Sequence, residues 1–520
     1  FGGMDDLSPE MIALFKKRTY DMVFTSQNHL NIWFNDVQLQ MTSCLDYIKL
    51  YLPESVDGHE LVHTAPHVRW YIAACMSPNF QFGQVSFVNG ICTLRGGRHV
   101  DYVVKQITAK LAAWILKKRK VEVRESFIKD NLMVFVNALI VNPSFDSQTK
   151  ETLTTNMKDF GSKFELDDKF IEHIAETGIV DRALAQTQFQ ESQILKKTDG
   201  KKNRRILDIE KLEDAELAGT KNAHLCTLIL TEGDSAKAMA VAGISAITDG
   251  RQYYGIFPLK GKLLNTRDVK EIELVNNTEI TNIKRILGLQ EGEVYTDVNK
   301  LRYGRIMSLC DSDVDGSHIK GLVINYISSH FPSLLKLPGF ITSMLTPIVK
   351  VWRGKHKDKA MSFYNLPDYN RWAEANDNGR GWNIKYYKGL GTSTPEEAKQ
   401  YFKDFQLVVY HWDDDSNESI DMAFNKERAD DRKTWMLGYD GQVLNLGQSR
   451  ITFTDFINKD LILFSIASVS RAIPHLMDGL KPSLRKIMYC CFKRNLTSEI
   501  KVAQLAGYVS EHGAYHHGEA

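Results

Sequence analysis

The sequence lacks several features that would set it apart from ordinary globular proteins. Its most apolar long stretch, residues 332–352, contains three prolines and Lys336, so it does not predict a membrane-spanning helix. Its seven cysteines form no C-x-x-C pair, which argues against a zinc knuckle and a disulfide framework and fits a reducing, intracellular compartment. The net charge is only +1, so any affinity for nucleic acid must come from local basic patches.

A length of 520 residues, with 43% hydrophobic and 25% charged residues, predicts about three globular domains. Residues 84–97 alternate apolar and polar positions up to a Gly-Gly turn, as in a half-buried strand. Residues 101–120 have apolar positions at helical spacing, and residues 131–143 resemble a buried strand that Asn-Pro ends. This order of strand, helix and strand predicts an α/β sandwich.

The composition changes at about residue 196. Residues 196–221 are polar and charge-rich, which is typical of a solvated linker; the alternative is a basic strap near DNA phosphates. A second α/β pattern follows, in which a short apolar strand reaches Glu232, and Asp234 and Ser235 are expected to cap the next helix. Beyond residue 450 the sequence predicts short helices with basic residues near the end.

Three aspartates at alternate positions, Asp311, Asp313 and Asp315, precede Gly316 between a strand-like and a helix-like segment. A calcium-binding EF-hand loop requires a glutamate at its twelfth position, where this sequence has Leu322, and a helix before the loop. An acidic cap on the following helix is the simpler alternative. A cap needs only one carboxylate, however, and three within five residues repel one another, which favours a bound cation.

Glu232 strengthens the metal hypothesis. Ligands of parallel α/β sheets bind at the carboxyl ends of the strands, and both Glu232 and Asp311 lie where a strand gives way to a helix. We therefore expect both carboxylates at the same edge of one sheet. A site made only of carboxylate oxygens favours Mg²⁺ with retained waters and a phosphate, which suits phosphoryl transfer at a nucleic-acid backbone.

Two of these motifs, EGDSA at 232–236 and DSDVDGSH at 311–318, are similar to the TOPRIM domain of type IIA DNA topoisomerases. Bacterial relatives divide the family's regions between two subunits, whereas here they follow one another without a break, which resembles the fused eukaryotic form. Further segments resemble the family in the same order: FDSQTKE at 145–151, PLKGKLLNTR at 258–267, YYKGLGTST at 386–394, DGLKPSLRKIMY at 478–489 and KVAQLAGYVSEHGAYHHGE at 501–519.

The resemblance implies a multidomain α/β fold and an ATP-hydrolysing isomerase. Such an enzyme makes a transient Mg²⁺-dependent double-strand break through 5′-phosphotyrosyl links and passes a second duplex through it. The implied domains are a transducer with an α/β sandwich like that of ribosomal protein S5 at 1–195, a charged linker at 196–221, a Rossmann-like TOPRIM metal-binding domain with a parallel sheet and a C-terminal extension at 222–448, and the truncated start of a winged-helix breakage–reunion domain at 449–520.

The resemblance also implies roles for individual residues. Glu232, Asp311 and Asp313 would ligate Mg²⁺, for which Mn²⁺ or Ca²⁺ could substitute, and Asp315 would join them through a water. Lys150, together with Gln148, would sense the ATP γ-phosphate. The implied DNA contacts are Lys260, Lys262, Lys481, Arg485 and Lys486, and the implied catalytic pair near the scissile DNA is His516 and His517.

The same resemblance implies that the partner is double-stranded DNA and that the full-length chain forms a homodimer. It also implies a nuclear location, with an organellar copy as the alternative. Because the sequence begins at Phe1 and ends at Ala520 inside AYHHGEA, we expect a fragment without the domain that binds most of the ATP and without the nucleophilic tyrosine. Two other readings of the metal motif stay open: a TOPRIM nuclease or primase that acts without a tyrosine, and a DNA clamp with a structural cation.

Overall fold

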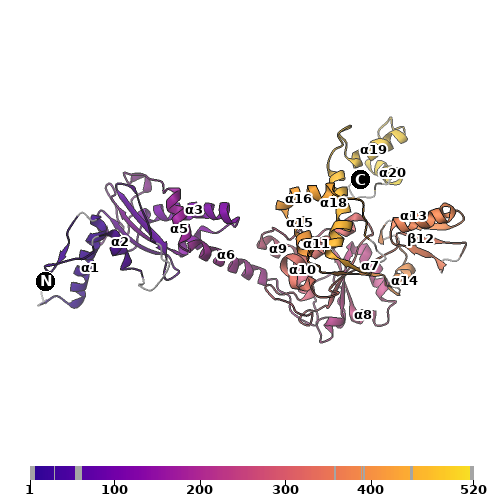
Figure 1. Cartoon of the computed structure of the whole chain (residues 1–520), viewed down its shortest axis with the longest axis horizontal. Coiled ribbons are helices and arrows are strands. Elements are labelled where there is room, and N and C mark those ends of the chain that lie inside the picture. Colours follow the sequence, from indigo (N-terminus) through magenta and orange to yellow (C-terminus); the bar gives the residue numbers. More distant parts are fainter. Residues whose placement is uncertain are drawn as a thin grey trace. The chain divides into compact units, whose positions relative to one another are not determined.

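The computed structural model divides the chain into two compact units, Phe1–Glu191 and Ser192–Ala520, called unit 1 and unit 2 below (Figure 1). Among the helices that the structure describes, none is long and apolar enough to cross a membrane. The described residues are 6–27, 30–41, 43–52, 61–355, 359–387, 389–390, 393–403, 405–444, 449–513 and 515.

Unit 1 is built on a five-stranded sheet with the strand order β3-β4-β7-β5-β6. Strands β5 and β7 are parallel and are joined through α3, and the other pairs are antiparallel. The strands are β3 (Val62–His67), β4 (Trp70–Met76), β5 (Gly83–Val88), β6 (Ile91–Cys92) and β7 (Leu132–Ala138), with a separate hairpin of β1 (Trp33–Phe34) and β2 (Val37–Gln38). The helices are α1 (Pro9–Ser26), α2 (Cys44–Lys49), α3 (Arg98–Arg119), α4 (Glu125–Asp130), α5 (Asp168–Glu176) and α6 (Ile179–Lys196), the last of which runs into unit 2.

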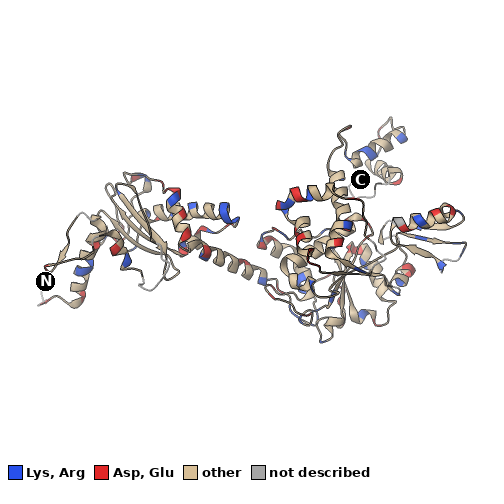
Figure 2. Ribbon diagram, viewed as in Figure 1, with Lys and Arg blue, Asp and Glu red and all other residues tan. Residues whose placement is uncertain are grey.

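Both faces of this sheet are covered, as expected for the predicted α/β sandwich. Helices α3 and α5 lie on one face, and α1 and α2 lie on the other (Figure 1). The alternation of side chains along β7 supplies both cores, because Val134 and Val136 pack toward α3 whereas Phe135 packs toward α1 and α2. Helix α3 ends in the basic turn Lys117–Arg119, which stands out in Figure 2.

The prediction of one strand over residues 84–97 is wrong in detail. The segment forms the β5–β6 hairpin, in which Val88 pairs with Ile91. Its turn residues Asn89 and Gly90 have φ angles of 50° and 80°, the left-handed conformation of a two-residue hairpin turn. Asn-Gly in a sequence indicates a hairpin turn. Here apolar and polar residues alternate on both sides of it, so the segment resembles one continuous strand.

Unit 2 contains a six-stranded sheet with the order β16-β15-β11-β10-β8-β9. Four neighbouring strands, from β11 to β9, are parallel, and β15 pairs antiparallel with β11. This sheet confirms the predicted Rossmann-like parallel architecture. The strands are β8 (Thr227–Glu232), β9 (Tyr254–Leu259), β10 (Arg305–Leu309), β11 (Ile341–Met344), β15 (Leu407–His411) and β16 (Arg450–Thr452).

Helices cover both faces of the six-stranded sheet. Helices α7 and α14 pack on one face, where a Cβ on Gly243 would lie 2.2 Å from the ring of Phe402, so only glycine permits this close approach. Helices α10 and α11 pack on the other face. The helices of this region are α7 (Gly233–Ile244), α8 (Gly250–Tyr253), α9 (Glu271–Asn276), α10 (Thr278–Leu287), α11 (Val314–His330), α12 (Pro332–Leu335) and α14 (Pro395–Lys403).

Two further parts complete unit 2. A small lobe consists of the antiparallel sheet β13-β12-β14 and α13 (Leu366–Ala375), with strands β12 (Val349–Trp352), β13 (Met361–Phe363) and β14 (Asn383–Tyr386). The last part is helical and includes a π-helical turn, η7 (Ile457–Leu461), directly before α18. Its helices are α15 (Ser416–Phe424), α16 (Ala429–Leu437), α17 (Phe453–Phe456), α18 (Ile462–Ala472), α19 (Pro482–Lys493) and α20 (Val502–Gly513).

The segment 196–221 has little regular secondary structure, but it is fixed to unit 2. The guanidinium of Arg302 is fully buried and donates to the carbonyl oxygens of Asn203 (2.7 Å) and Ile286 (2.8 Å), and it also pairs with Asp214. A Cβ on Gly219 would lie only 2.1 Å from the Asn203 oxygen. Arg302 therefore joins this segment to the core at two positions, Asn203 and Asp214.

We expect Arg302→Ala to destabilise unit 2 by about 3–5 kcal/mol, because it leaves the Asp214 carboxylate and two carbonyl groups without their buried partner. Urea unfolding of the chain measures the change. Arg305→Ala, which removes an exposed side chain bonded to the Gly339 oxygen, is the control and should change stability by less than about 1 kcal/mol. Equal effects of the two substitutions would contradict the anchoring role.

Candidate metal centre

The pairing of β8 with β10 brings the predicted carboxylates together. The two strands are parallel, and Leu309 lies opposite Thr231, so the residues that follow them meet at the carboxyl edge of the sheet. The backbone N–H of Asp311 donates to Oε2 of Glu232 at 3.2 Å, although 79 positions separate them in the sequence. The expectation that both acids lie at one sheet edge is therefore confirmed.

The pKa of the Glu232 carboxyl is raised at this sheet edge. Burial raises the pKa of the Glu232 carboxyl to about 7, and the charges of Asp311, Asp313 and Asp315 add to the rise, against the hydrogen bond from the Asp311 N–H. Such a carboxyl ionises with difficulty unless a cation compensates its charge. The donor set of oxygen atoms and its excess negative charge fit a hard divalent cation.

Asp311 is fixed by a second loop. Its Oδ1 accepts the backbone N–H of Leu390 at 2.8 Å, and a Cβ on the neighbouring Gly389 would lie 2.4 Å from Oδ2. Glycine at this position therefore lets the backbone approach a partner closely, and this partner is the Asp311 carboxylate. Burial also raises the pKa of Asp311, and the charge of Asp313 adds to the rise while the Leu390 hydrogen bond opposes it.

Asp313 caps helix α11. Its Oδ1 accepts the backbone N–H of Gly316 at 2.8 Å, so the simple alternative of a helix cap applies to this one aspartate. The capping expected of Asp234 is wrong, because α7 begins at Gly233 with no side-chain cap and Asp234 instead pairs with Lys211 at 2.8 Å. Gly233, with φ of 78°, makes the sharp turn from β8 into α7.

Asp315 forms ion pairs with two basic side chains. Its carboxylate contacts Lys262 Nζ at 2.7 Å and both terminal nitrogens of Arg471 at 3.0 and 3.2 Å. Burial alone would raise the pKa of Asp315, but these hydrogen bonds and charges outweigh it and hold the pKa at about 2. Phe464 completes the cluster, since Lys262 Nζ lies 4.6 Å from its ring centre and the His318 ring stacks on it at 3.8 Å.

The four carboxylates line one cleft of about 810 Å³, which Lys262, Arg471 and Lys486 also line. Acidic groups thus share a cleft with basic groups from the helices α18 and α19. Within the described part of the chain, however, no three His, Cys, Asp or Glu side chains are placed to hold a metal ion together. Backbone N–H groups hold one oxygen each of Glu232, Asp311 and Asp313, and Lys262 and Arg471 hold Asp315.

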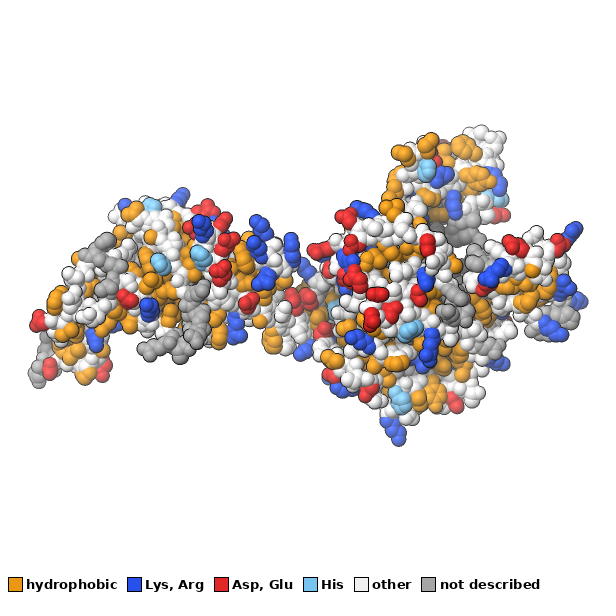
Figure 3. All heavy atoms as spheres, viewed as in Figure 1, with side chains coloured by type: hydrophobic (Ala, Val, Ile, Leu, Met, Phe, Trp, Pro, Cys, Tyr) orange, Lys and Arg blue, Asp and Glu red, His pale blue; other side chains and the backbone are white. Residues whose placement is uncertain are grey.

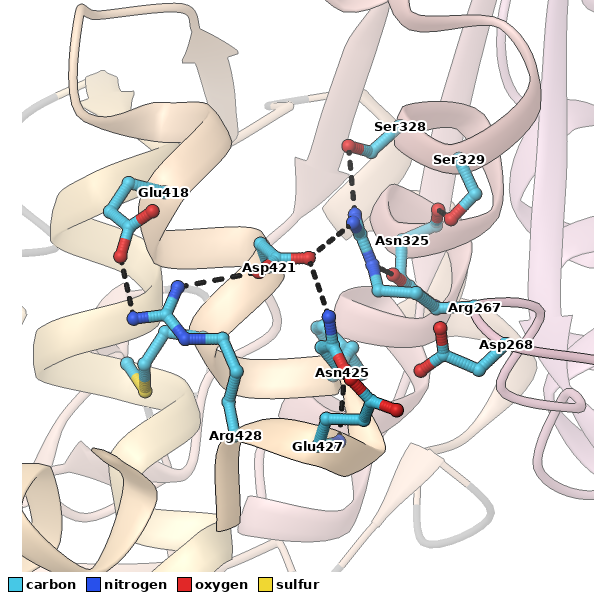
Figure 4. A network of polar contacts seen from close by, with 12 residues as sticks. Arg267, Asp268, Asn325, Ser328, Ser329, Glu418, Asp421, Asn425, Glu427 and Arg428 are labelled. Atoms are coloured by element: carbon cyan, nitrogen blue, oxygen red, sulfur yellow. Dashed lines mark hydrogen bonds and ion pairs between the residues drawn. The ribbon is translucent and has the colours of Figure 1, made fainter. Parts of the chain in front are cut away.

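Asn265 and Arg267, at the end of the PLKGKLLNTR motif, hold this part of unit 2 together. Figure 4 shows Arg267 between Asn325 and Asp421. Arg267 donates to Asn325 on α11 at 3.1 Å and to Asp421 on α15 at 2.8 Å, while Asn265 bonds to the Phe424 oxygen at 2.8 Å. These contacts fix the turn that carries Lys262 beside Asp315.

The other predicted DNA contacts are dispersed. Lys260 and Lys481 are exposed, and Lys486 lines the cleft. Arg485 is engaged with Asp478 through two hydrogen bonds of 2.7 and 2.8 Å. His516 and His517 lie outside the described residues.

The predicted nucleotide-sensing residues belong to unit 1, whereas the residues that line the cleft belong to unit 2. Lys150 has φ of 59°, and its loop is attached to the turn before α3, since Leu153 N donates to Gly96 O at 3.1 Å. Glu151 also pairs with Arg95 at 3.0 Å. Gln148 is exposed in the same loop.

Sequence reasoning missed Arg471 and Phe464. Both lie on α18, more than 140 positions from the aspartates, in a segment that predicts only an ordinary amphipathic helix. A single arginine at the end of such a helix gives no local signal of its distant partner.

Four protein-family models match successive regions of the chain. Residues 227–341 match the Toprim domain, and residues 344–469 match the C-terminal associated domain of TOPRIM. Residues 43–203 match DNA gyrase B, and residues 471–520 match the A subunit of DNA gyrase/topoisomerase IV. The order of these matches agrees with the order of the motifs.

The chain is 49% identical to a probable DNA topoisomerase 2 of Dictyostelium discoideum and 47% identical to DNA topoisomerase 2 of Arabidopsis thaliana. These alignments cover 100% and 99% of this chain but 34% and 35% of the relatives, so the chain spans about a third of their length. It is also similar to the crystal structure of the Plasmodium falciparum topoisomerase II DNA-binding, cleavage and re-ligation domain, with 51% identity and a TM-score of 0.56 over 61% of this chain and 43% of that one. The chain belongs to the eukaryotic-type DNA topoisomerase II family.

Proposed function

We propose that this chain is the central part of an ATP-dependent type IIA DNA topoisomerase, an isomerase that cuts both strands of one duplex and passes a second duplex through the break. One observation carries the proposal: Glu232, Asp311 and Asp313 line the same cleft as Arg471 and Lys486. The acidic side chains suit a divalent cation, and the basic side chains suit backbone phosphates. Cleavage of a DNA backbone in this cleft would use both.

In this proposal Glu232, Asp311 and Asp313 hold Mg²⁺, which would stabilise charge on the phosphate oxygens during cleavage. The Asp311, Leu390 and Gly316 N–H groups each fix one oxygen of a carboxylate, which orients the second oxygen as the candidate ligand. Asp315 has a different role, because two cations already neutralise it. It acts at most through a water and otherwise holds Lys262 and Arg471 in the cleft.

Basic residues would bind the backbone of the cleaved duplex. Lys262 and Lys486 line the cleft, and the exposed Lys260 and Lys481 lie a few residues before them in the sequence. Arg485 would release Asp478 and bind a phosphate in its place. His516 and His517 would act near the scissile bond.

The remaining parts of the proposal concern control and assembly. Residues 1–195 act as the transducer, in which Gln148 and Lys150 contact ATP bound mainly by another domain. Residues 222–448 form the metal-binding TOPRIM region, and residues 449–520 begin the winged-helix region. The whole protein would work as a homodimer on nuclear DNA.

Asp313→Asn tests the metal site. Asparagine caps a helix as well as aspartate does, so α11 and the fold should be retained while one ligand charge is lost. Because a metal ion contributes several kcal/mol to the transition state, Mg²⁺-dependent DNA cleavage by the full-length protein should fall by about 100-fold or more. Plasmid cleavage measures this change, and thermal unfolding checks the fold.

Asp234→Asn is the matched control, because Asp234 lies in the same motif but pairs with Lys211 outside the cleft. It should leave cleavage within about twofold of wild type. Near-normal cleavage by Asp313→Asn would refute the metal assignment. Nicking of DNA by residues 1–520 alone would favour a nuclease instead.

Mg²⁺ binding should depend on pH through Glu232. Its pKa of about 7 lies above the ordinary 4.5, so its ionisation lowers the stability of the metal-free protein as the pH rises from 4.5 to 7. Mg²⁺ should offset this loss and raise the unfolding temperature more at pH 8 than at pH 6. Differential scanning fluorimetry with and without Mg²⁺ measures the difference.

Glu232→Gln should remove this pH dependence. At pH 8 without Mg²⁺ the variant should unfold at a higher temperature than wild type, because a buried charge is gone. An equal Mg²⁺-induced shift in the wild-type protein at pH 6 and pH 8 would contradict the assignment.

A further inference from the structure

A run of cations at the start of unit 2 plays no part in the function proposed above. Six basic residues lie within ten positions, and their side chains are exposed. We call this run the basic strap. It consists of Lys196, Lys197, Lys201, Lys202, Arg204 and Arg205.

The backbone of the basic strap is anchored at its beginning. Lys284, only 4% exposed, donates to the Leu195 oxygen at 2.9 Å and pairs with Asp199 at 2.8 Å. Gly200 N donates to Leu289 O at 2.8 Å, and a Cβ on Gly200 would lie 2.6 Å from Gly288 Cα. This part of the strap therefore cannot move away from α10 without breaking buried contacts.

The end of the basic strap is anchored by another buried cation. The Arg302 guanidinium donates to the Asn203 oxygen at 2.7 Å, between the basic pairs Lys201–Lys202 and Arg204–Arg205. The strap thus presents its cations on a fixed backbone, unlike a solvated linker. A fixed arrangement of charges loses less conformational entropy when it binds a partner.

The acids near the basic strap form their ion pairs with other cations. Asp199 and Glu291 pair with Lys284, and Asp208 pairs with Arg285 at 2.5 Å. Asp214 pairs with Arg302. Within the described residues, the six strap cations form no ion pair, and Lys202 donates to the Asn299 carbonyl oxygen.

The local charge contrasts with the rest of the protein. The whole chain has a net charge of +1, and acidic and basic side chains are interspersed over the face shown in Figure 3. A dense group of exposed cations on a nearly neutral protein attracts a polyanion through local contacts. Backbone phosphates are the polyanion that a chain acting on DNA would meet.

We propose that the basic strap is a second duplex-DNA contact that binds backbone phosphates without reading sequence. It is separate from the cleft of the candidate metal centre, since none of the residues that line the cleft belongs to the strap. The proposal rests on the proposed function, because it takes DNA as the partner. It adds a binding surface outside the cleavage site.

The salt dependence of DNA binding by residues 1–520 tests the strap. Fluorescence anisotropy with a labelled duplex, in EDTA and between 50 and 200 mM KCl as rough limits, reports binding without cleavage. The triple variant Lys201→Gln, Arg204→Gln and Arg205→Gln removes three exposed charges. The slope of log Kobs against log salt should become shallower by about 2–3, since each phosphate contact contributes about 0.9.

The control removes three exposed cations of the small lobe, with Lys355→Gln, Lys359→Gln and Arg380→Gln. It has the same net charge as the strap variant and should keep the wild-type slope within about 0.5. An unchanged slope in the strap variant, or the same decrease in both variants, would overturn the proposal. Either result leaves the proposed function intact, whereas failure of the wild-type chain to bind duplex DNA would overturn both.

Poly-glutamate at equal charge concentration separates DNA from acidic protein partners. It should displace the duplex from the wild-type chain poorly, because its flexible carboxylates lack the regular array of a duplex. Equally strong, strap-dependent binding of poly-glutamate would overturn the assignment of DNA as the partner.

Discussion

The parallel pairing of β8 with β10 is the constraint on which the candidate site depends. It joins two segments 79 positions apart and places a glutamate and an aspartate side by side at the sheet edge. Burial at this edge raises the pKa of Glu232, and the repulsion from the neighbouring aspartates adds to the rise. Backbone N–H groups and two basic side chains restrain the cluster, so the fold holds together charges that would otherwise separate.

The sequence predicted what is encoded locally. Strand ends and alternating aspartates were sufficient to place Glu232 and Asp311 at one edge, and the parallel sheet followed from the alternation of strands and helices. The partners of Asp315 could not be predicted in this way, because Lys262 and Arg471 lie 53 and 156 positions away. The packing of α11 against α18 brings Arg471 to Asp315, and the contacts of Asn265 and Arg267 with α11 and α15 fix the turn that brings Lys262 there.

Other errors have different causes. Asn89-Gly90 is a readable hairpin signal that the alternation of neighbouring residues conceals. Segment 196–221 has the composition of a linker, yet two buried cations, Lys284 and Arg302, attach it to the core. Those cations lie about 80–100 positions further along the chain, so the surface composition of the segment gives no sign of its anchorage.

The π-helical turn η7 has a geometric consequence for the cleft. A π-turn accommodates one more residue than an α-turn, and each residue rotates an α-helix by about 100°. The turn therefore sets the angular phase of α18 relative to α17, while Asp460 within it is bonded to Ser317 on α11 at 2.8 Å. Phe464 and Arg471 share this phase, so the length of a five-residue turn determines which face of α18 meets the aspartates.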